Sequence, residues 1–320
     1  MRVAIVGSVL GFGGVEQHML NLAIGLRRIG HEPYVIGLVN AGGFDLLREW
    51  ADPERRIPVT WLDGEGDDGL RRALEVLRPD MLSAQLPFPG LPLEGVSIPM
   101  VWTAHGRYSL NAPPPRPGPI ICMDGRVADA ARGLTMGGAT TTIWNGIDLE
   151  RFKFSGDVSR EGIAYVGRWD PPKLAGLGQL RVKGQVDVFG ADGLPSEAEQ
   201  VRNCRAWARP EIVYWGYRVV IAGGLCAVEA MACGALLLMP ELNPQGTVLD
   251  SLANTSFSPM THYSGAHDPN ADLARLLALE RDGVDELQSW QRRWAQTHHD
   301  CIDMARRFAD VYEVALCESS

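Results

Sequence analysis

The chain has 320 residues, 46% of them hydrophobic and 22% charged, with a formal net charge of −9. Its length predicts two domains of roughly 150 residues each, and its acidic balance excludes a broad nucleic-acid-binding surface, which needs clustered lysine and arginine. No run of about 18 apolar residues and no signal peptide is visible, so we expect a cytoplasmic protein with at most peripheral membrane contact.

Strand and helix patterns alternate through the first half of the chain. "RVAIVG" (residues 2–7) predicts a buried parallel strand, and the apolar stripe from Met19 to Ile29 predicts a helix that ends at Gly30. A helix carrying Leu70, Leu74 and Leu77 on one face is also expected, with further strands at residues 34–39, 58–63, 80–86, 99–105 and 118–124. This alternation indicates a doubly wound parallel sheet.

A second series of elements begins near residue 150. It includes the segments "GIAYVG", "QVDVFGAD", "EIVYWGY", "VEAMACG" and "ALLLMPE", and a helix at about residues 195–207. Residues 284–316 predict a helix with apolar anchors from Trp290 to Tyr312. We therefore expect an α/β protein with domains at 1–150 and 151–320, in which the last helix is able to pack back on the first domain.

The six cysteines are scattered along the chain without CxxC spacing or a nearby histidine pattern. This favours buried thiols over disulfides or zinc ligands. We expect no metal site and no bound cofactor.

A glycine-rich stretch, "GFGGVEQHML" (residues 11–20), joins the first strand to the first helix. It is not a dinucleotide fingerprint, because the third glycine is replaced by Glu16 and the second strand ends in Val39 and Asn40. It is not a Walker A loop either, because no Gly-Lys-Ser or Gly-Lys-Thr follows. Two interpretations remain: backbone N–H groups that face an anion, or a tight turn that needs glycine for its dihedral angles.

Four segments in order resemble the GT-B glycosyltransferases of family 4, which use nucleotide sugars and retain the anomeric configuration. They are "GGVEQHMLNLAIGLRRIGHEPYVIG", "IWNGIDLERF" (143–152), "AYVGRW…K" (164–173) and "VEAMACGALLLMPE" (228–241). The resemblance spans most of the chain. It implies two Rossmann-like domains facing a cleft, with the acceptor on the first domain and the UDP- or GDP-sugar on the second.

The resemblance assigns roles to four residues around the phosphates. Gly13 and Gly14 would approach the donor, and Arg168 and Lys173 would grip the diphosphate of the leaving nucleotide, where negative charge grows as the sugar departs. No metal is then needed. Outside these motifs, Arg168 and Lys173 would be read as solvated surface residues; Arg181 and Lys183 are lower-ranked substitutes for Lys173.

Two further roles follow from the resemblance. Glu229 would accept hydrogen bonds from the ribose hydroxyls, and its apolar neighbours require a partner or a ligand for a buried carboxylate. His105, in "WTAHG", would face the transferred sugar, although a satisfied core histidine is the alternative. Gly223 and Gly224 open the helix that carries Glu229 and would present N–H groups to a phosphate.

The chain departs from the family pattern at one acid. Many family members carry a glutamate eight positions before the one in "EAMA", and that position is Ile221 here. The second domain is also short between Lys173 and Glu229. These departures leave three hypotheses: an active hexosyltransferase acting on a carbohydrate, lipid-linked or small-molecule acceptor; an inactive GT-B binding protein; and a nucleotide-sugar epimerase or phosphorylase on the same scaffold.

Overall fold

The computed structural model describes residues 1–10, 13–40, 57–62, 66–86, 96–106, 110, 117–132, 139–155, 160–167, 185–190, 201–204, 209–238 and 269–319. The chain divides into two compact units. The first unit combines Met1–Asp148 with Asp300–Ser320, and the second is Leu149–His299. The assignment of the acceptor to one domain and of the nucleotide sugar to the other stays a prediction.

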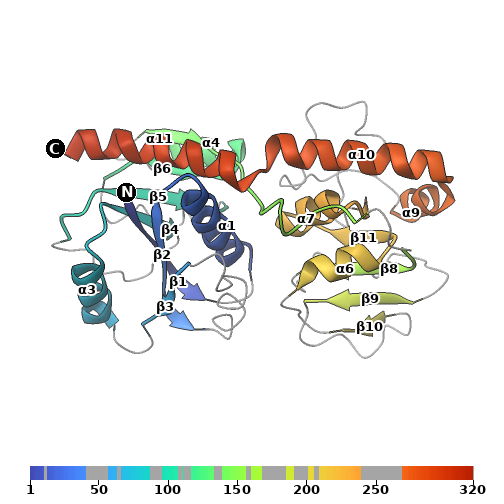
Figure 1. Ribbon diagram of the computed structural model, residues 1–320, viewed down its shortest axis with the longest axis horizontal. Helices are drawn as coiled ribbons and strands as arrows, with labels where there is room; N and C mark the ends of the chain where they lie inside the picture. Colours follow the sequence, from blue (N-terminus) through green and yellow to red (C-terminus); the bar gives the residue numbers. More distant parts are fainter. Residues whose placement is uncertain are drawn as a thin grey trace. The chain divides into compact units, whose positions relative to one another are not determined.

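Within the described residues, the first unit contains a seven-stranded parallel sheet in the order β3-β2-β1-β4-β5-β6-β7 (Figure 1). Continuous apolar runs such as Val3 to Val6 suit these strands, because helices cover both faces of the sheet. The strands are β1 (Arg2–Leu10), β2 (Glu32–Asn40), β3 (Val59–Trp61), β4 (Met81–Leu86), β5 (Met100–Ala104), β6 (Ile120–Cys122) and β7 (Thr140–Thr142).

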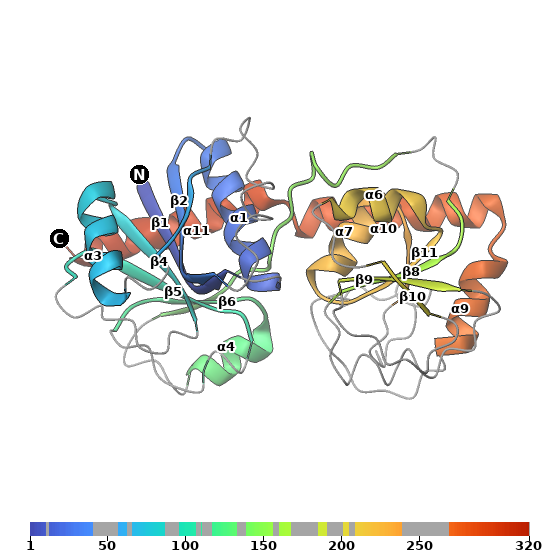
Figure 2. The same ribbon diagram turned by 90° about the horizontal axis from the view of Figure 1, so that it is seen from below.

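Each face of this sheet has its own core. One core lies under α1 (Gly14–Arg28) and α11 (Cys301–Ser319), which lie side by side in Figures 1 and 2. The other lies under α3 (Gly66–Leu77) and α4 (Gly125–Arg132). The final helix is therefore part of the first unit, and its Phe308 and Tyr312 are fully buried there.

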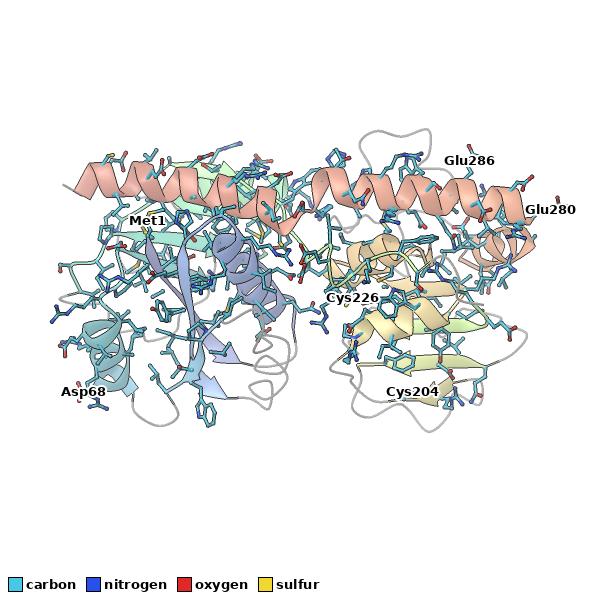
Figure 3. The ribbon with its side chains drawn as sticks, in the orientation of Figure 1. Met1, Asp68, Cys204, Cys226, Glu280 and Glu286 are labelled. Carbon is cyan, nitrogen blue, oxygen red and sulfur yellow. The ribbon has the colours of Figure 1, made fainter. Side chains whose placement is uncertain are left out.

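The described part of the second unit contains a five-stranded parallel sheet in the order β10-β9-β8-β11-β12. Helix α10 packs on α7 and buries Leu287, while the exposed Glu286 points to solvent in Figure 3. The elements are β8 (Ile163–Val166), β9 (Val186–Phe189), β10 (Val201–Asn203), α6 (Pro210–Gly216), β11 (Val219–Ala222), α7 (Leu225–Cys233), β12 (Leu236–Leu238), α9 (Pro269–Ala278) and α10 (Arg281–His298).

The predicted α/β class with doubly wound sheets is confirmed, but two elements differ from the prediction. Residues 201–203 form β10 rather than part of a helix, because they pair in register with β9. The C-terminal segment forms α10 and α11 rather than one helix. The break is at Asp300, whose carboxylate accepts a hydrogen bond from the N–H of Ile302 at 2.8 Å and so caps the new helix.

Two smaller expectations also differ from the structure. Strand β7, with the sequence Thr-Thr-Thr, was not predicted, because it lies at the sheet edge and has no apolar run. Cys122, Cys233 and Cys301 are buried as expected, whereas Cys317 is exposed. All six cysteines are free, with Cys204 and Cys226 partly buried, so the expectation of buried thiols holds for three of the six.

Candidate functional site

Both sheets bring glycines to the carboxyl end of a strand where the strand order reverses. In the first unit the order reverses between β1 and β4, and in the second between β8 and β11. Ligands of open α/β sheets bind outside the carboxyl ends of the strands at such switch points. Gly13 follows β1, and Gly223 follows β11. Each unit therefore has one edge where a ligand is expected.

In the first unit, helix α1 begins at this edge with no side-chain cap. Gly13 precedes the helix in an extended conformation, with φ −154° and ψ 175°, and no side chain caps the first turn. Any residue adopts such angles, so the dihedral explanation for glycine is not supported at Gly13. Gly13 and Gly14 bring no side chain to the first turn of α1, which agrees with the interpretation of an anion site at this helix start.

His105 lies at the same edge, directly after β5. Its Nε2 lies 2.8 Å from Oε1 of Gln85, on the neighbouring strand β4. Nε2 of Gln85 in turn donates to the hydroxyl of Ser83 at 3.3 Å. Burial lowers the pKa of His105 well below its usual value, and the neighbouring His18 adds to this effect. Burial and the neighbouring His18 therefore favour the neutral form of His105.

His18, from α1, lies behind His105. The two rings meet edge to face with centroids 4.8 Å apart, and Nδ1 of His18 donates to Oδ1 of Asn145 at 2.6 Å. His18 is fully buried, and burial lowers its pKa to about 4 although the Asn145 hydrogen bond opposes the shift. Its Nε2 makes no hydrogen bond to the described part of the chain.

In the second unit, β11 passes into α7 through Gly223 and Gly224. Gly224 has φ +60°, a conformation that favours glycine, and no side chain caps α7. A Cβ added to either glycine would meet no described atom within 4 Å. Among the described residues, the space beside the Cα atoms of these two glycines is therefore open.

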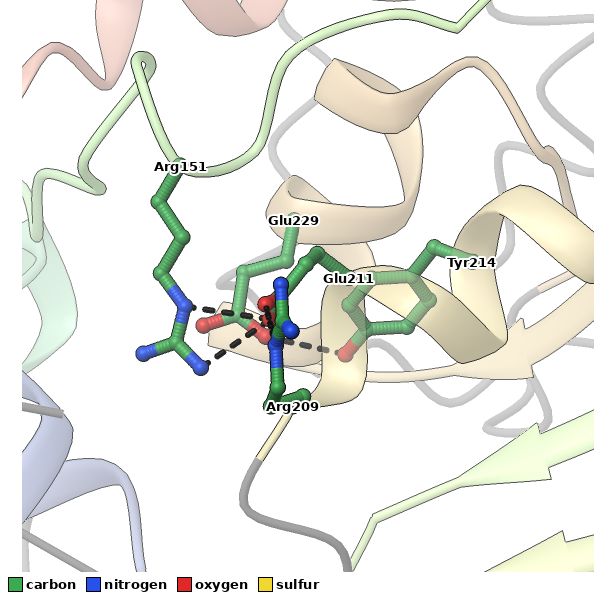
Figure 4. A network of polar contacts seen from close by, with 5 residues as sticks. All are labelled: Arg151, Arg209, Glu211, Tyr214 and Glu229. Atoms are coloured by element: carbon green, nitrogen blue, oxygen red, sulfur yellow. Dashed lines mark hydrogen bonds and ion pairs between the residues drawn. The ribbon is translucent and has the colours of Figure 1, made fainter. Parts of the chain in front are cut away.

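Glu229 lies one turn further along α7 and is 1% exposed. Its carboxylate accepts a hydrogen bond from the hydroxyl of Tyr214 at 2.9 Å (Figure 4). Burial raises the pKa of Glu229 to about 7, while the Tyr214 hydrogen bond and the charge of Arg151 oppose the shift. The sequence indicated that Glu229 needs a partner, and Tyr214 is one.

A second buried carboxylate, Glu211, lies beside Glu229 (Figure 4). It accepts hydrogen bonds from Nε and Nη2 of Arg151 at 3.1 and 3.0 Å, and from Nε of Arg209 at 3.0 Å. Arg151 ends the "NGIDLER" segment, so this ion pair joins the start of the second unit to α6. Two arginines thus compensate the charge of Glu211, and the charge of Arg151 also acts on Glu229, which accepts from the hydroxyl of Tyr214.

The remaining predicted site residues have different outcomes. Arg168 and Lys173 lie outside the described residues, as do Arg181 and Lys183. Arg168 directly follows Gly167, the first residue after β8, which is at the switch point. Ile221 is fully buried inside β11. An apolar side chain therefore occupies the position at which many family members carry an acid.

Two other features are absent from the described residues. There, no cluster of three or more His, Cys, Asp or Glu side chains has the arrangement to hold a metal ion. Among the described helices, none has the length and apolarity needed to cross a membrane.

Sequence reasoning missed the residues that hold His105 and Glu229. Gln85 lies in a buried strand, where a polar residue is a usable signal. Tyr214 precedes Glu229 by fifteen positions, and no sequence pattern connects them.

Comparison with known proteins agrees with this architecture. Residues 12–151 match the family model described as Glycosyltransferase Family 4. The fold of the whole chain matches solved glycosyltransferases. The chain has the GT-B fold. Anabaena HepE, solved with UDP and glucose, is 14% identical with TM-score 0.68, over 98% of this chain and 100% of HepE.

Two other GT-B structures give the same result. The pneumococcal O-GlcNAc transferase GtfA, in complex with UDP and GlcNAc, is 10% identical with TM-score 0.68, over 99% of each chain. WaaG, from lipopolysaccharide biosynthesis, is 14% identical with TM-score 0.64, over 97% of this chain and 99% of WaaG. A search of curated proteins gave no match. The predicted resemblance to GT-B glycosyltransferases of family 4 is thus confirmed.

Proposed function

We propose that the protein is a hexosyltransferase that moves a sugar from a UDP- or GDP-sugar to an acceptor, with retention and without a metal. The observation that carries the proposal is the turn from β11 to α7. It combines open space at Gly223 and Gly224, the uncapped N-terminus of a helix and a buried carboxylate, Glu229. A nucleoside diphosphate carries an anion and a ribose diol, which these groups complement.

The second unit would bind the nucleotide. The N–H groups at the start of α7 face the diphosphate in this proposal, and Glu229 accepts hydrogen bonds from the ribose hydroxyls. Departure of the sugar places negative charge on the diphosphate, which a helix N-terminus and cations stabilise. Arg168 and Lys173 would supply these cations. HepE and GtfA were solved with UDP, which supports a UDP-sugar as the first donor to test.

The first unit would contribute contacts to the transferred sugar and would bind the acceptor. His105 contacts a hydroxyl of the sugar in this proposal, and Gly13 and Gly14 allow the donor to approach the start of α1. The acceptor is a carbohydrate, a lipid-linked sugar or a small molecule.

Titration of the purified protein with UDP, GDP and their sugars tests the proposal. One nucleotide class should raise the thermal unfolding temperature, in proportion to RT ln(1 + [L]/Kd). The donor should also be hydrolysed slowly in the absence of an acceptor. EDTA should leave this hydrolysis unchanged.

The outcomes separate the alternatives. Binding without hydrolysis or transfer would indicate a GT-B binding protein, to which the loss of the acid at Ile221 points. Conversion of the sugar without release of nucleotide would indicate an epimerase, and dependence of cleavage on inorganic phosphate would indicate a phosphorylase. No binding of any nucleotide would contradict the proposal.

A further inference from the structure

The second unit buries two carboxylates, Glu211 and Glu229, which are 4% and 1% exposed. Both belong to one cluster of polar side chains, together with Arg151, Arg209 and Tyr214 (Figure 4). Two carboxylates that share a buried site repel each other, and each tends to bind a proton unless a cation compensates its charge. The positions of the two arginines therefore determine how easily each carboxylate stays charged.

The two arginines differ in their exposure to water. Arg151 donates from Nε and Nη2 to Oε2 of Glu211 at 3.1 and 3.0 Å, and Arg209 donates from Nε to Oε1 at 3.0 Å. The side chain of Arg151 is 10% exposed, whereas that of Arg209 is 62% exposed. Water and salt screen an exposed charge much more strongly than a buried one. Arg151 is therefore the arginine whose charge acts most strongly inside the cluster.

The charge of Arg151 acts on Glu229 as well as on Glu211. Burial raises the pKa of Glu229, the hydrogen bond from Tyr214 and the charge of Arg151 lower it, and the charge of Glu211 adds to the rise. A guanidinium does not lose its proton in a protein, so this positive charge is permanent. The two hydrogen bonds to Glu211 fix its place. Glu211 thus anchors the cation that favours the ionised form of Glu229.

We propose that Arg151 is a positioning residue, anchored on Glu211, whose permanent charge keeps Glu229 ionised so that its carboxylate accepts hydrogen bonds from both ribose hydroxyls. This inference rests on the proposed function for the role of the ribose. An ionised carboxylate accepts at both oxygens, whereas a protonated carboxyl uses one oxygen as a donor. Arg151 would therefore support nucleotide binding through Glu229, without a contact of its own to the nucleotide.

The other titratable groups near Glu229 do not supply a competing cation. Among the described residues, the titratable groups that act on Glu229 or on its partner Tyr214 are Arg151, Glu211, Cys226 and Cys233. Burial raises the pKa of Cys233 well above its usual value, so this thiol stays neutral. Helix α10, which packs on α7, buries the neutral side chain of Gln291. The charges that act on Glu229 are thus those of Arg151 and Glu211.

The protonation of Glu229 can be followed by ¹³C NMR of the ligand-free protein labelled at the glutamate carboxyl carbons. The carboxyl shift reports the charge directly, and Glu229→Gln assigns the signal. Arg151→Gln should raise the titration midpoint of Glu229 by about one pH unit, because an opposite charge nearby lowers a carboxyl pKa by one unit or more. An unchanged midpoint in Arg151→Gln would overturn the proposal.

Two further substitutions distinguish an effect of charge from an effect of packing. Arg151→Lys keeps the charge and should leave the midpoint of Glu229 within about half a unit of the wild type. Glu211→Gln removes the neighbouring negative charge and should lower the midpoint. Should Arg151→Gln fail to fold, a midpoint that does not fall in Glu211→Gln would contradict the proposal.

Arg209→Gln provides the matched control. It removes one positive charge from the same cluster and one hydrogen bond to Glu211, as Arg151→Gln does, but from a side chain that is 62% exposed. The midpoint of Glu229 should therefore stay close to that of the wild type. An equal rise in Arg209→Gln and Arg151→Gln would show that the total charge of the cluster, and not the buried place of Arg151, sets the midpoint.

The affinity for UDP-glucose, measured by calorimetry at two pH values, tests the consequence for binding. Arg151→Gln should bind about three- to tenfold more weakly than the wild type at pH 7 and nearly as tightly at pH 8.5, where Glu229 is charged in both proteins. A merely structural role would weaken binding equally at both pH values, which would contradict the proposal. In the Glu229→Gln background, Arg151→Gln should add no pH dependence.

The two proposals fail in different ways. If no nucleotide sugar binds but the midpoint of Glu229 depends on Arg151 as expected, only the proposed function is wrong. If UDP-glucose binds and is hydrolysed but the midpoint is independent of Arg151, only this inference is wrong.

Discussion

Glu229 combines deep burial with a pKa close to physiological pH. Burial raises this pKa to about 7, so Glu229 changes its charge near neutral pH. In the proposed function, ribose hydroxyls donate to Glu229, and both carboxyl oxygens accept only in the charged form. Binding of the nucleotide sugar should therefore be coupled to loss of a proton.

The affinity for UDP-glucose, or for whichever nucleotide sugar binds, should rise with pH. Below the pKa of Glu229 the carboxyl is protonated and one acceptor is lost, so between about pH 6 and pH 8 the dissociation constant should fall by up to about tenfold and then level off. Calorimetric titration across this range measures it. The ligand for this titration should be a nucleotide sugar and not UDP, because the terminal phosphate of UDP itself titrates in the same pH range.

Glu229→Gln is the control for this pH effect. Glutamine has nearly the same shape and does not titrate, so its affinity should be lower at pH 8 and nearly independent of pH. An equally steep pH dependence in the variant would exclude Glu229 as the titrating group.

His18 makes the first unit sensitive to acid. Burial lowers its pKa from 6.5 to about 4, so the unfolded state binds more protons between these values. The contribution of His18 to the free energy of unfolding is then fully present above about pH 6.5. It is lost as the pH drops toward 4, by on the order of 3 kcal/mol in total. His18→Gln, which keeps a donor for Asn145, should flatten this decline.

Hydrogen exchange of the α1 amides at several pH values below 7 measures the effect in the first unit alone, because the two units need not unfold together. Equal acid sensitivity of the wild type and His18→Gln would show that other groups cause the decline.

At the scale of elements, the close approach of α1 and α11 depends on Gly25. A Cβ at this position would lie 2.1 Å from the carbonyl oxygen of Cys301 and 2.7 Å from Cβ of Ala305. The oxygen belongs to the backbone, so the helices must separate. Gly25→Ala should destabilise the first unit by at least about 2 kcal/mol, measured by urea unfolding.

Gly125→Ala is the matched control, because it adds the same methyl group to another helix of the first unit. A Cβ at Gly125 would meet no described atom within 4 Å, so its effect should stay within about 1 kcal/mol. Equal destabilisation by the two substitutions would contradict the tight α1–α11 contact.

The elements also show which parts of the structure could be predicted from sequence. Strand β1 and helix α1 carry local patterns, an apolar run and an apolar stripe, and both were predicted. Strand β10 has no such pattern, because its pairing with β9 stabilises it. The same holds for the candidate site: Glu229 and His105 lie in motifs, but Tyr214 and Gln85 are brought to them only by tertiary packing.

At the scale of the whole molecule, the chain leaves the first unit and returns to it at neighbouring residues. Ile147 and Asp300 form a β-bridge, and the N–H of Cys301 donates to the carbonyl of Ile147 at 3.0 Å. The residues before and after the second unit are therefore adjacent. The first unit is completed by α11, whose Phe308 and Tyr312 fill one of its cores.

A chain in which Met1–Asp148 is joined to Asp300–Ser320 by a short Gly-Ser linker should fold without the second unit. It should unfold cooperatively in circular dichroism, because the bridge already brings the two ends together. Residues 1–148 without the final helix should be unfolded or aggregated, since the apolar faces of α1 and β5 would be exposed to water. Folding of residues 1–148 alone would contradict an essential role for α11.

This connectivity has a consequence for biosynthesis. The chain emerges from the ribosome with its N-terminus first. Residues 1–148 therefore emerge early, but the helix that covers their apolar surface is still missing. All residues of 149–299 become available before α11 does. The domain in the middle of the gene is therefore the first able to finish folding, while the domain begun first stays open until the last helix has been translated.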